Sequence, residues 1–142
     1  MYTPKWIFDA LNITVDLDVA SSDSPYVVVP ALNKYTIEDD ALIQPWYGRI
    51  WMNPPFSGVT PWVNKWLDHS NGMLLVPLSS NGKWVNRLWE SEAAVMFLPP
   101  NLAFVGGLDG KESKHRWRCS IMAIGEENIQ TLIDSKIGRV KR

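Results

Sequence analysis

The chain has one cysteine, Cys119, and two histidines among its 142 residues, which argues against disulfides and against Cys/His metal sites. One cysteine cannot form an internal disulfide, and no Cys/His pair has the spacing of a zinc site. No apolar run approaches the roughly 20 residues that a membrane-spanning helix needs, and no N-terminal stretch has the pattern of a signal peptide. We therefore expect a soluble, cytoplasmic protein with no metal ion and no membrane contact.

Neither sign of charge is in marked excess, because the formal net charge is −1. This value excludes a general electrostatic attraction to nucleic acid. The distribution is uneven, since residues 1–50 carry three basic and seven acidic side chains, whereas residues 51–142 carry eleven and eight. Lys114, Arg116 and Arg118 lie in a basic segment that could contact DNA phosphates locally. A solvated loop is the alternative interpretation of this segment.

Length and composition predict one domain over residues 1–142. A chain of this length, 46% hydrophobic, fits one compact core and is too short for two full domains. Eight tryptophans are many for its size. They favour an aromatic core, and a surface that meets a flat ligand is the alternative. The oligomeric state is left open.

Apolar residues recur with two periods along the chain. Alternating or continuous apolar runs predict strands at Val15–Val19, Arg49–Met52, Met73–Val76, Ala93–Leu98 and Arg118–Ile124. Helical spacing predicts helices over 4–11, after Thr60-Pro61, around Trp84–Trp89 and around Ile129–Ile133. This alternation indicates an α/β domain with a mostly parallel sheet and helices on both faces.

Ligands of such sheets bind beyond the carboxyl ends of the strands. Asp18 and Asn53 are expected at that edge. Between the two, residues 22–35 have no clear pattern, and Thr36 with Asp39 resembles a capping box that opens a brief turn or helix. The stretch Gly106–Lys114 is expected to be a mobile loop.

The segment Asn53-Pro54-Pro55-Phe56 directly follows a predicted strand. An exocyclic amine on a base is a poor nucleophile because its lone pair is delocalised into the ring. Acceptors directed at its N–H groups localise that pair, and an Asn carbonyl followed by a rigid Pro-Pro backbone carbonyl supplies two of them. The aromatic ring that follows can stack on a base that has left the duplex. A proline-capped strand end without catalytic function is the alternative.

This tetrapeptide resembles the Asp/Asn/Ser-Pro-Pro-Tyr/Phe/Trp signature of amino-methyltransferases. The flanking Trp51, Ser57 and Trp62 are similar to the corresponding segment of the phage DNA N-6-adenine methyltransferase family. The opening of the chain, Thr3-Pro4 followed by Asp16-Leu17-Asp18-Val19-Ala20, is similar to the first block of the same family.

The resemblance implies a Rossmann-like S-adenosylmethionine-dependent methyltransferase fold of reduced size, with DNA as substrate and the N-6 amino group of adenine as target. It implies that Asn53, Pro54, Pro55 and Phe56 form the catalytic loop. For the cofactor, it implies hydrogen bonds to Asp18 and Asp16, contacts of the methionine part with Thr3 and Pro4, and a contribution from Asp40.

Two departures from the wider methyltransferase pattern leave alternatives open. The glycine-rich turn is absent, with Ala20-Ser21 in its place, and Phe56 replaces the commoner Tyr. A degenerate methyltransferase fold that binds DNA or a host protein without catalysis is one alternative. Methylation of a protein glutamine or of a cytosine amino group is another, although Ser is commoner than Asn in the first position for cytosine.

Overall fold

The computed structural model describes residues 2–77, 83–100, 103–106, 109–114 and 118–142. Its helices are α1 (Lys5–Leu11), α2 (Val59–His69), α3 (Lys83–Glu90) and α4 (Glu126–Ser135), with short 3-10 turns η1 (Ile37–Asp39) and η2 (Ala41–Ile43). Its strands are β1 (Val15–Asp18), β2 (Ala31–Lys34), β3 (Ile50–Met52), β4 (Gly72–Pro77), β5 (Ala94–Phe97), β6 (Ala103–Val105), β7 (Glu112–Lys114), β8 (Cys119–Ile124) and β9 (Val140–Lys141). None of the helices within these ranges is long and apolar enough to cross a bilayer.

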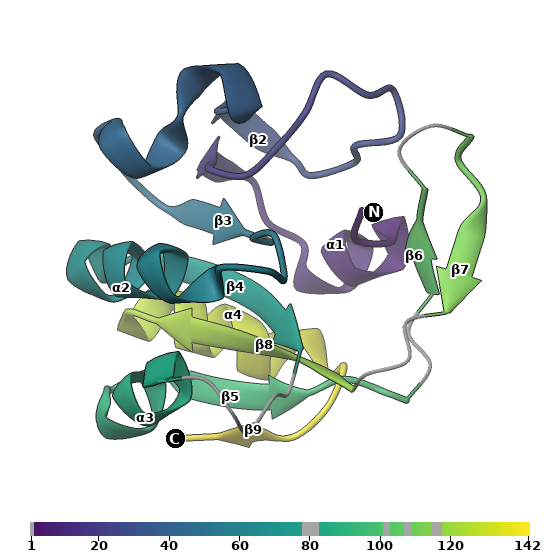
Figure 1. Cartoon of the computed structure of the whole chain (residues 1–142). Coiled ribbons are helices and arrows are strands. Elements are labelled where there is room, and N and C mark those ends of the chain that lie inside the picture. The colour runs from purple at the N-terminus through teal and green to yellow at the C-terminus, as the bar shows by residue number, and fades with distance from the viewer. Residues whose placement is uncertain (1, 78–82, 101–102, 107–108, 115–117) are drawn as a thin grey trace.

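Seven strands form one sheet in the order β2-β1-β3-β4-β8-β5-β9 (Figure 1). The pairs β1/β2, β1/β3 and β3/β4 are parallel. Strand β8 is antiparallel to both β4 and β5, and β9 is antiparallel to β5. The sheet is therefore mostly parallel, as predicted, but β8 and β9 run against the other strands.

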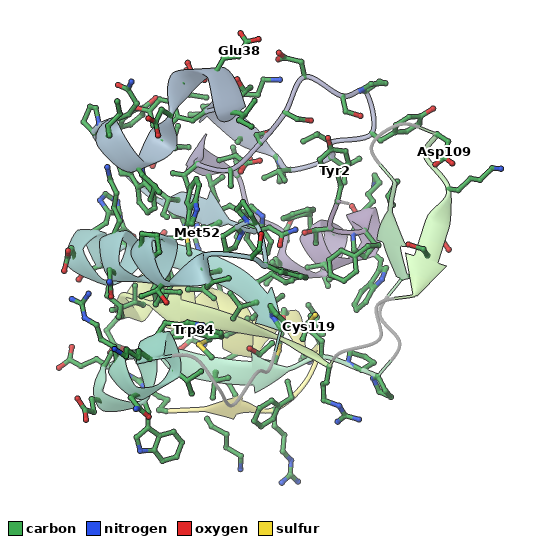
Figure 2. All side chains as sticks on the ribbon, in the orientation of Figure 1. Tyr2, Glu38, Met52, Trp84, Asp109 and Cys119 are labelled. Carbon is green, nitrogen blue, oxygen red and sulfur yellow. The ribbon has the colours of Figure 1, made fainter. Side chains whose placement is uncertain are left out.

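Helices cover both faces of the sheet, which confirms the predicted layers (Figure 1). On one face, α1 and α4 pack with Trp51 and neighbouring strand residues in one apolar cluster. On the other face, α2 and α3 pack in a second cluster. Met52 and Trp84 belong to this second cluster, and Figure 2 labels both between the sheet and its helices. The two cores explain why the strands have apolar side chains on both faces.

The order of the strands reverses at β1. The chain passes from β1 to β2 on one side and then returns to β3 on the other side of β1. The carboxyl ends of β1 and β3 thus meet at a topological switch point, where the connections leave in opposite directions and open a crevice.

Two segments differ from the expectations. Residues 22–35, for which the sequence showed no clear pattern, contain β2. This short edge strand is mostly exposed and therefore lacks an apolar pattern. The prediction of a mobile loop over Gly106–Lys114 was wrong in its last part, because Glu112–Lys114 form β7 and pair with β6 in an antiparallel hairpin. The cap at Thr36 is confirmed, since its backbone N–H donates to the Asp39 carboxylate at 2.7 Å.

A polar cluster fastens α4 to the amino ends of the strands. Asn128, 1% exposed, donates to Asn71 Oδ1 and to the Ile124 carbonyl, both at 2.8 Å. Its own Oδ1 accepts from Arg49 Nε at 2.5 Å. Arg49 also donates to the Thr131 hydroxyl at 2.7 Å. One buried carboxamide therefore satisfies groups from three separate segments.

Asn128→Ala is expected to lower the free energy of unfolding by about 2–3 kcal/mol, because it leaves buried partners without hydrogen bonds. Urea unfolding would measure the change, with Gln130→Ala on the exposed side of the same helix as the control. A loss equal to that of the control would show that water replaces the side chain without cost.

Candidate active site

The switch point contains a pocket formed by segments that are distant in the sequence. It is lined by Tyr2, Thr3, Asp18, Ala20, Ser21, Val27, Val28, Val29, Trp51 and Asn53. The structure thus brings together Thr3, Asp18 and Asn53, three of the residues that the sequence analysis singled out.

Asn53 directly follows β3, and the sheet ends there because Pro54 and Pro55 follow it in turn. Pro54 is buried and Pro55 is exposed, so the Pro-Pro turn lies at the surface of the domain. The Asn53 side chain is only partly buried, and its Nδ2 donates to Thr3 Oγ1 at 3.1 Å. The carboxamide is therefore held at one end beside the pocket.

Phe56 presents an accessible aromatic ring next to this turn. Its side chain is 37% exposed, and its ring meets the buried Phe104 of β6 edge-on, with the centroids 6.3 Å apart. The contact supports the ring at its position while leaving part of it open to solvent. Such a ring can stack against a flat ligand.

Asp18 ends β1 inside the pocket and is 3% exposed. Burial raises the pKa of its carboxyl to about 6, and the Ala20 backbone N–H, the Ser21 hydroxyl and the Lys34 charge oppose this rise. The Ala20 N–H donates to Asp18 Oδ1 at 3.3 Å. Above pH 6 the pocket thus holds a poorly solvated carboxylate, which a hydroxyl or ammonium group of a ligand would stabilise.

Trp51 also lines the pocket. It pairs with Asp18 across the β1/β3 ladder, is 1% exposed and meets Phe8 edge-on. Within the part of the chain that the structure describes, its indole N–H has no hydrogen-bond partner. A buried donor without an acceptor is costly. The described residues leave this buried donor unsatisfied next to the strand that carries Asp18.

The pocket is narrow, with a cavity volume of about 50 Å³. Sites for small molecules usually start at roughly 300 Å³. One side of it is the irregular segment Val27–Val29, which belongs to no helix or strand and whose Val29 packs against the first apolar cluster. The cavity of this structure is therefore smaller than a nucleoside-sized ligand.

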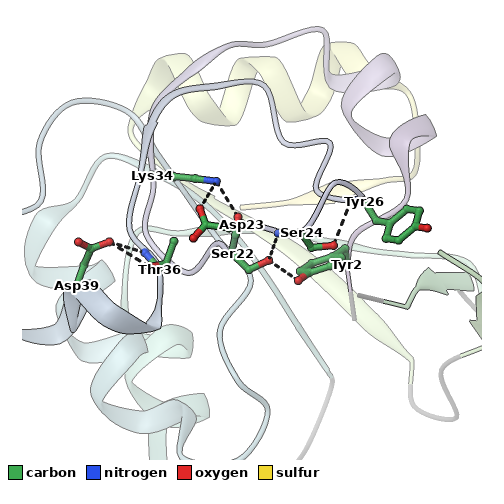
Figure 3. Close-up of polar contacts among 8 residues, drawn as sticks. All are labelled: Tyr2, Ser22, Asp23, Ser24, Tyr26, Lys34, Thr36 and Asp39. Carbon is green, nitrogen blue, oxygen red and sulfur yellow. Dashed lines mark hydrogen bonds and ion pairs between the residues drawn. The ribbon is translucent and has the colours of Figure 1, made fainter. Parts of the chain in front are cut away.

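Hydrogen bonds hold residues 22–24, which lead from Ser21 of the pocket toward this segment (Figure 3). The Tyr2 and Ser22 hydroxyls are hydrogen-bonded to each other, and Ser22 also accepts from the Ser24 backbone N–H at 3.1 Å. Lys34 of β2 donates to the Ser22 carbonyl at 2.8 Å and pairs with Asp23 at 3.0 Å. These contacts are exposed or only partly buried, so each contributes little to stability.

Three of the predicted cofactor residues, Asp16, Asp40 and Pro4, do not line the pocket. Asp16 accepts from the Arg49 backbone N–H at 2.7 Å, and Gly48 packs so closely on it that a Cβ there would lie 2.3 Å from Oδ2. Asp40 is an exposed residue that joins η1 and η2. Asp16 thus binds the backbone of the segment before β3, and Asp40 links two 3-10 turns. Pro4 is buried beside Thr3 at the start of α1 but does not line the pocket.

The residues suggested for phosphate contacts are spread along the hairpin and β8. Lys114 ends β7, and Arg118 is exposed immediately before β8. Arg116 lies outside the described residues. Cys119 pairs with Pro77 at the carboxyl end of β4, so Arg118 lies at the same edge of the sheet as Asn53. The edge with the pocket thus carries at least one exposed cation.

A larger hollow of about 360 Å³ lies elsewhere, lined by Leu67, Ser70, Arg87, Glu90, Ser91, Glu92 and Ile124. Ser70 and Ser91 precede β4 and β5, so this hollow is at the amino ends of the parallel strands. Open α/β sheets bind ligands at the carboxyl ends. None of the predicted site residues lines it, and size alone does not make it the site.

Sequence reasoning missed several residues that shape the pocket. Ser21 follows an acidic strand end, which is a signal that could have included it. Tyr2 and Val27–Val29 join the site only through tertiary contacts, and no local pattern pointed to them as site residues. Among the described residues, no group of three or more His, Cys, Asp or Glu side chains could hold a metal ion.

The fold is an α/β domain with a mostly parallel sheet, helices on both faces and a pocket where the strand order reverses. The model of the DNA N-6-adenine-methyltransferase (Dam) family matches residues 1–140, and the chain belongs to this family. It is 24% identical over 135 residues to the DNA N-6-adenine-methyltransferase of Haemophilus phage HP1 (strain HP1c1). That match covers 87% of this chain and 76% of the phage protein. No solved structure matches the chain significantly.

The buried Asp18 should leave a signature in the dependence of stability on pH. Its folded pKa of about 6 lies above its ordinary value of 3.8, so the folded state binds more protons between these values and stability falls as the pH rises from 4 to 6. Asp18→Asn should remove this component. The variant should match the wild type at pH 4 and exceed it by up to about 3 kcal/mol at pH 8.

Urea unfolding at several pH values would measure the difference between the two proteins, so that contributions from other carboxyls cancel. Asp134→Asn, an exposed position on α4, is the control and should leave the pH profile unchanged. A constant difference between Asp18→Asn and the wild type at every pH would mean that the folded Asp18 has an ordinary pKa.

Proposed function

We propose that this chain is an S-adenosylmethionine-dependent DNA methyltransferase that methylates the N-6 amino group of adenine. The observation that carries the proposal is the position of Asn53 at the switch point, tied to Thr3 and beside the pocket that contains Asp18. Membership of the DNA N-6-adenine-methyltransferase family supports the reaction and the substrate. The fold is then a small Rossmann-like methyltransferase domain, in agreement with its strand order.

In this proposal, Asn53 Oδ1 and the Pro54 carbonyl accept hydrogen bonds from the two N–H groups of the adenine amine. These bonds draw the amine out of conjugation with the ring and direct its lone pair toward the methyl donor. The two prolines restrict the backbone before the substrate binds, so little conformational entropy is lost on binding. The nitrogen releases one proton to solvent after methylation, since neither acceptor is a base of suitable pKa.

The target base must leave the duplex to reach this turn. The partly exposed Phe56 ring can stack on the extruded adenine, with Phe104 behind it as a support. Replacement of Tyr by Phe keeps this stacking and removes only a hydroxyl group. Arg118 would contact a phosphate near the same edge, where such a contact adds a salt-dependent contribution to affinity.

The residues that would hold the cofactor are Asp18 and Trp51. When bound, S-adenosylmethionine supplies a methyl group activated by its positive sulfur. Asp18 would accept hydrogen bonds from hydroxyl or amino groups, and the Trp51 indole would donate to an acceptor. Asp16 and Asp40, which the resemblance also implied, are left out of this proposal because their side chains lie away from the pocket.

Asn53→Ala is expected to lower the methylation rate at least 1000-fold, because both the acceptor and its geometry are lost. Affinity for S-adenosylmethionine should change less than threefold. The assay combines tritiated S-adenosylmethionine with unmethylated DNA of mixed sequence, followed by digestion to nucleosides and detection of label in N-6-methyladenosine. Calorimetry measures the cofactor affinity of the same preparations.

Asn33→Ala, an exposed asparagine on β2, is the matched control and should keep full activity. Label in a cytosine nucleoside would move the substrate to cytosine. Cofactor binding without label in any nucleoside would redirect the search to a protein glutamine. A wild-type protein that neither binds S-adenosylmethionine nor methylates any nucleoside would favour a non-catalytic module. An active Asn53→Ala enzyme would refute the assigned role of the side chain.

A further inference from the structure

The hydrogen bond between Asn53 and Thr3 joins the catalytic turn to the start of the chain, 50 residues earlier. Asn53 Nδ2 donates to Thr3 Oγ1 at 3.1 Å, and Thr3 is 3% exposed. The resemblance to the family implied a contact of Thr3 with the cofactor's methionine part. The contact that the structure shows is with the catalytic asparagine.

The two ends of a carboxamide have opposite hydrogen-bonding character, and only the oxygen accepts. An Asn53 side chain that turned over would present N–H groups to an amine that also offers N–H groups. The substrate hydrogen bond would then be lost. Because Thr3 Oγ1 takes the Nδ2 end, Oδ1 is left as the end available to the substrate.

Thr3 is itself held on both sides. Tyr2, its neighbour, forms a bridge with Val105 of β6, through N–H···O distances of 2.6 and 2.9 Å. On its other side, Pro4 is buried and fixes the backbone dihedral at the beginning of α1. The backbone of Thr3 is therefore fixed, and its hydroxyl can bind Asn53 Nδ2 in one orientation of the carboxamide only.

Strand β6 supports the catalytic turn at a second point. Phe104, adjacent to Val105, contacts the Phe56 ring. One short strand thus positions both the ring proposed to stack on the base and, through Tyr2 and Thr3, the carboxamide proposed to bind the amine.

We propose that Thr3 is a positioning residue, which fixes the Asn53 carboxamide with its oxygen toward the target amine. This inference rests on the proposed function for the identity of the amine, but the hydrogen bond itself can be tested without turnover. Loss of the hydroxyl should lower the rate of methyl transfer and leave the affinity for the cofactor unchanged.

Thr3→Val removes the hydroxyl and keeps the shape of the side chain, whereas Thr3→Ser keeps the hydroxyl. Under single-turnover conditions with saturating S-adenosylmethionine and DNA, Thr3→Val should be about 10-fold slower than the wild type. Thr3→Ser should be within threefold of it. Calorimetry should give cofactor dissociation constants within twofold for all three proteins, and Thr14→Val, an exposed threonine before β1, is the matched control.

The second readout is the side-chain NH₂ signal of Asn53 in ¹⁵N-correlated NMR spectra of the free protein, assigned by its disappearance in Asn53→Ala. The signal should shift and exchange faster with solvent in Thr3→Val but not in Thr3→Ser. If the wild type methylates no nucleoside, the proposed function fails, and this spectrum still decides whether Thr3 holds the carboxamide.

Two results would overturn the positioning role. The first is an unchanged Asn53 NH₂ signal in a folded Thr3→Val protein. The second is an unchanged single-turnover rate combined with weaker cofactor binding, which would make Thr3 a cofactor contact instead. If Thr3→Val does not fold, Thr3→Ala replaces it. A shifted Asn53 NH₂ signal in Thr3→Ala together with an unshifted signal in Thr3→Ser would support the positioning role, and an unshifted signal in both would overturn it.

Discussion

Parallel pairing of β1 with β2 on one side and with β3 on the other is the constraint on which the site depends. Parallel strands bring their carboxyl ends to one edge, and the change of direction at β1 prevents either connection from covering that edge. Asp18 and Asn53, 35 positions apart in the sequence, become neighbours of one pocket for this reason. The same edge is where backbone hydrogen bonding stops, so polar side chains and free loop geometry are tolerated there.

The second constraint comes from the segment around β6, which lies outside the main sheet. It supports Phe56 through Phe104 and the N-terminus through the bridge to Tyr2. The Asn53-Pro54-Pro55-Phe56 turn is stiff along its backbone because of its prolines, but its side chains can still rotate. The contacts of β6 restrict the rotation of the Phe56 ring directly and that of the Asn53 carboxamide through Tyr2 and Thr3. Rigid support of this kind is what positions functional groups for a reaction.

Local patterns were sufficient for much of the fold. Apolar periodicity predicted the four helices and most central strands, because these elements bury side chains whose spacing reflects their geometry. Strands β2, β6 and β7 were missed for the opposite reason. They are three or four residues long, and β2 and β7 are largely exposed, so their pairing depends on partners elsewhere in the chain. The direction of β8 was also beyond local reasoning, since apolar character is the same in either orientation.

The sequence by itself determined the chemistry of the site: a carboxylate at one strand end, and an Asn-Pro-Pro-Phe turn at another. It did so because strand ends, prolines and acceptor groups are local properties. Only the tertiary structure decided which acidic residues reach the pocket. Asp18 is buried there with a raised pKa, whereas Asp16, two residues earlier, is used by the Arg49 backbone. Successive acidic residues have the same chemistry, and register and burial alone separate their roles.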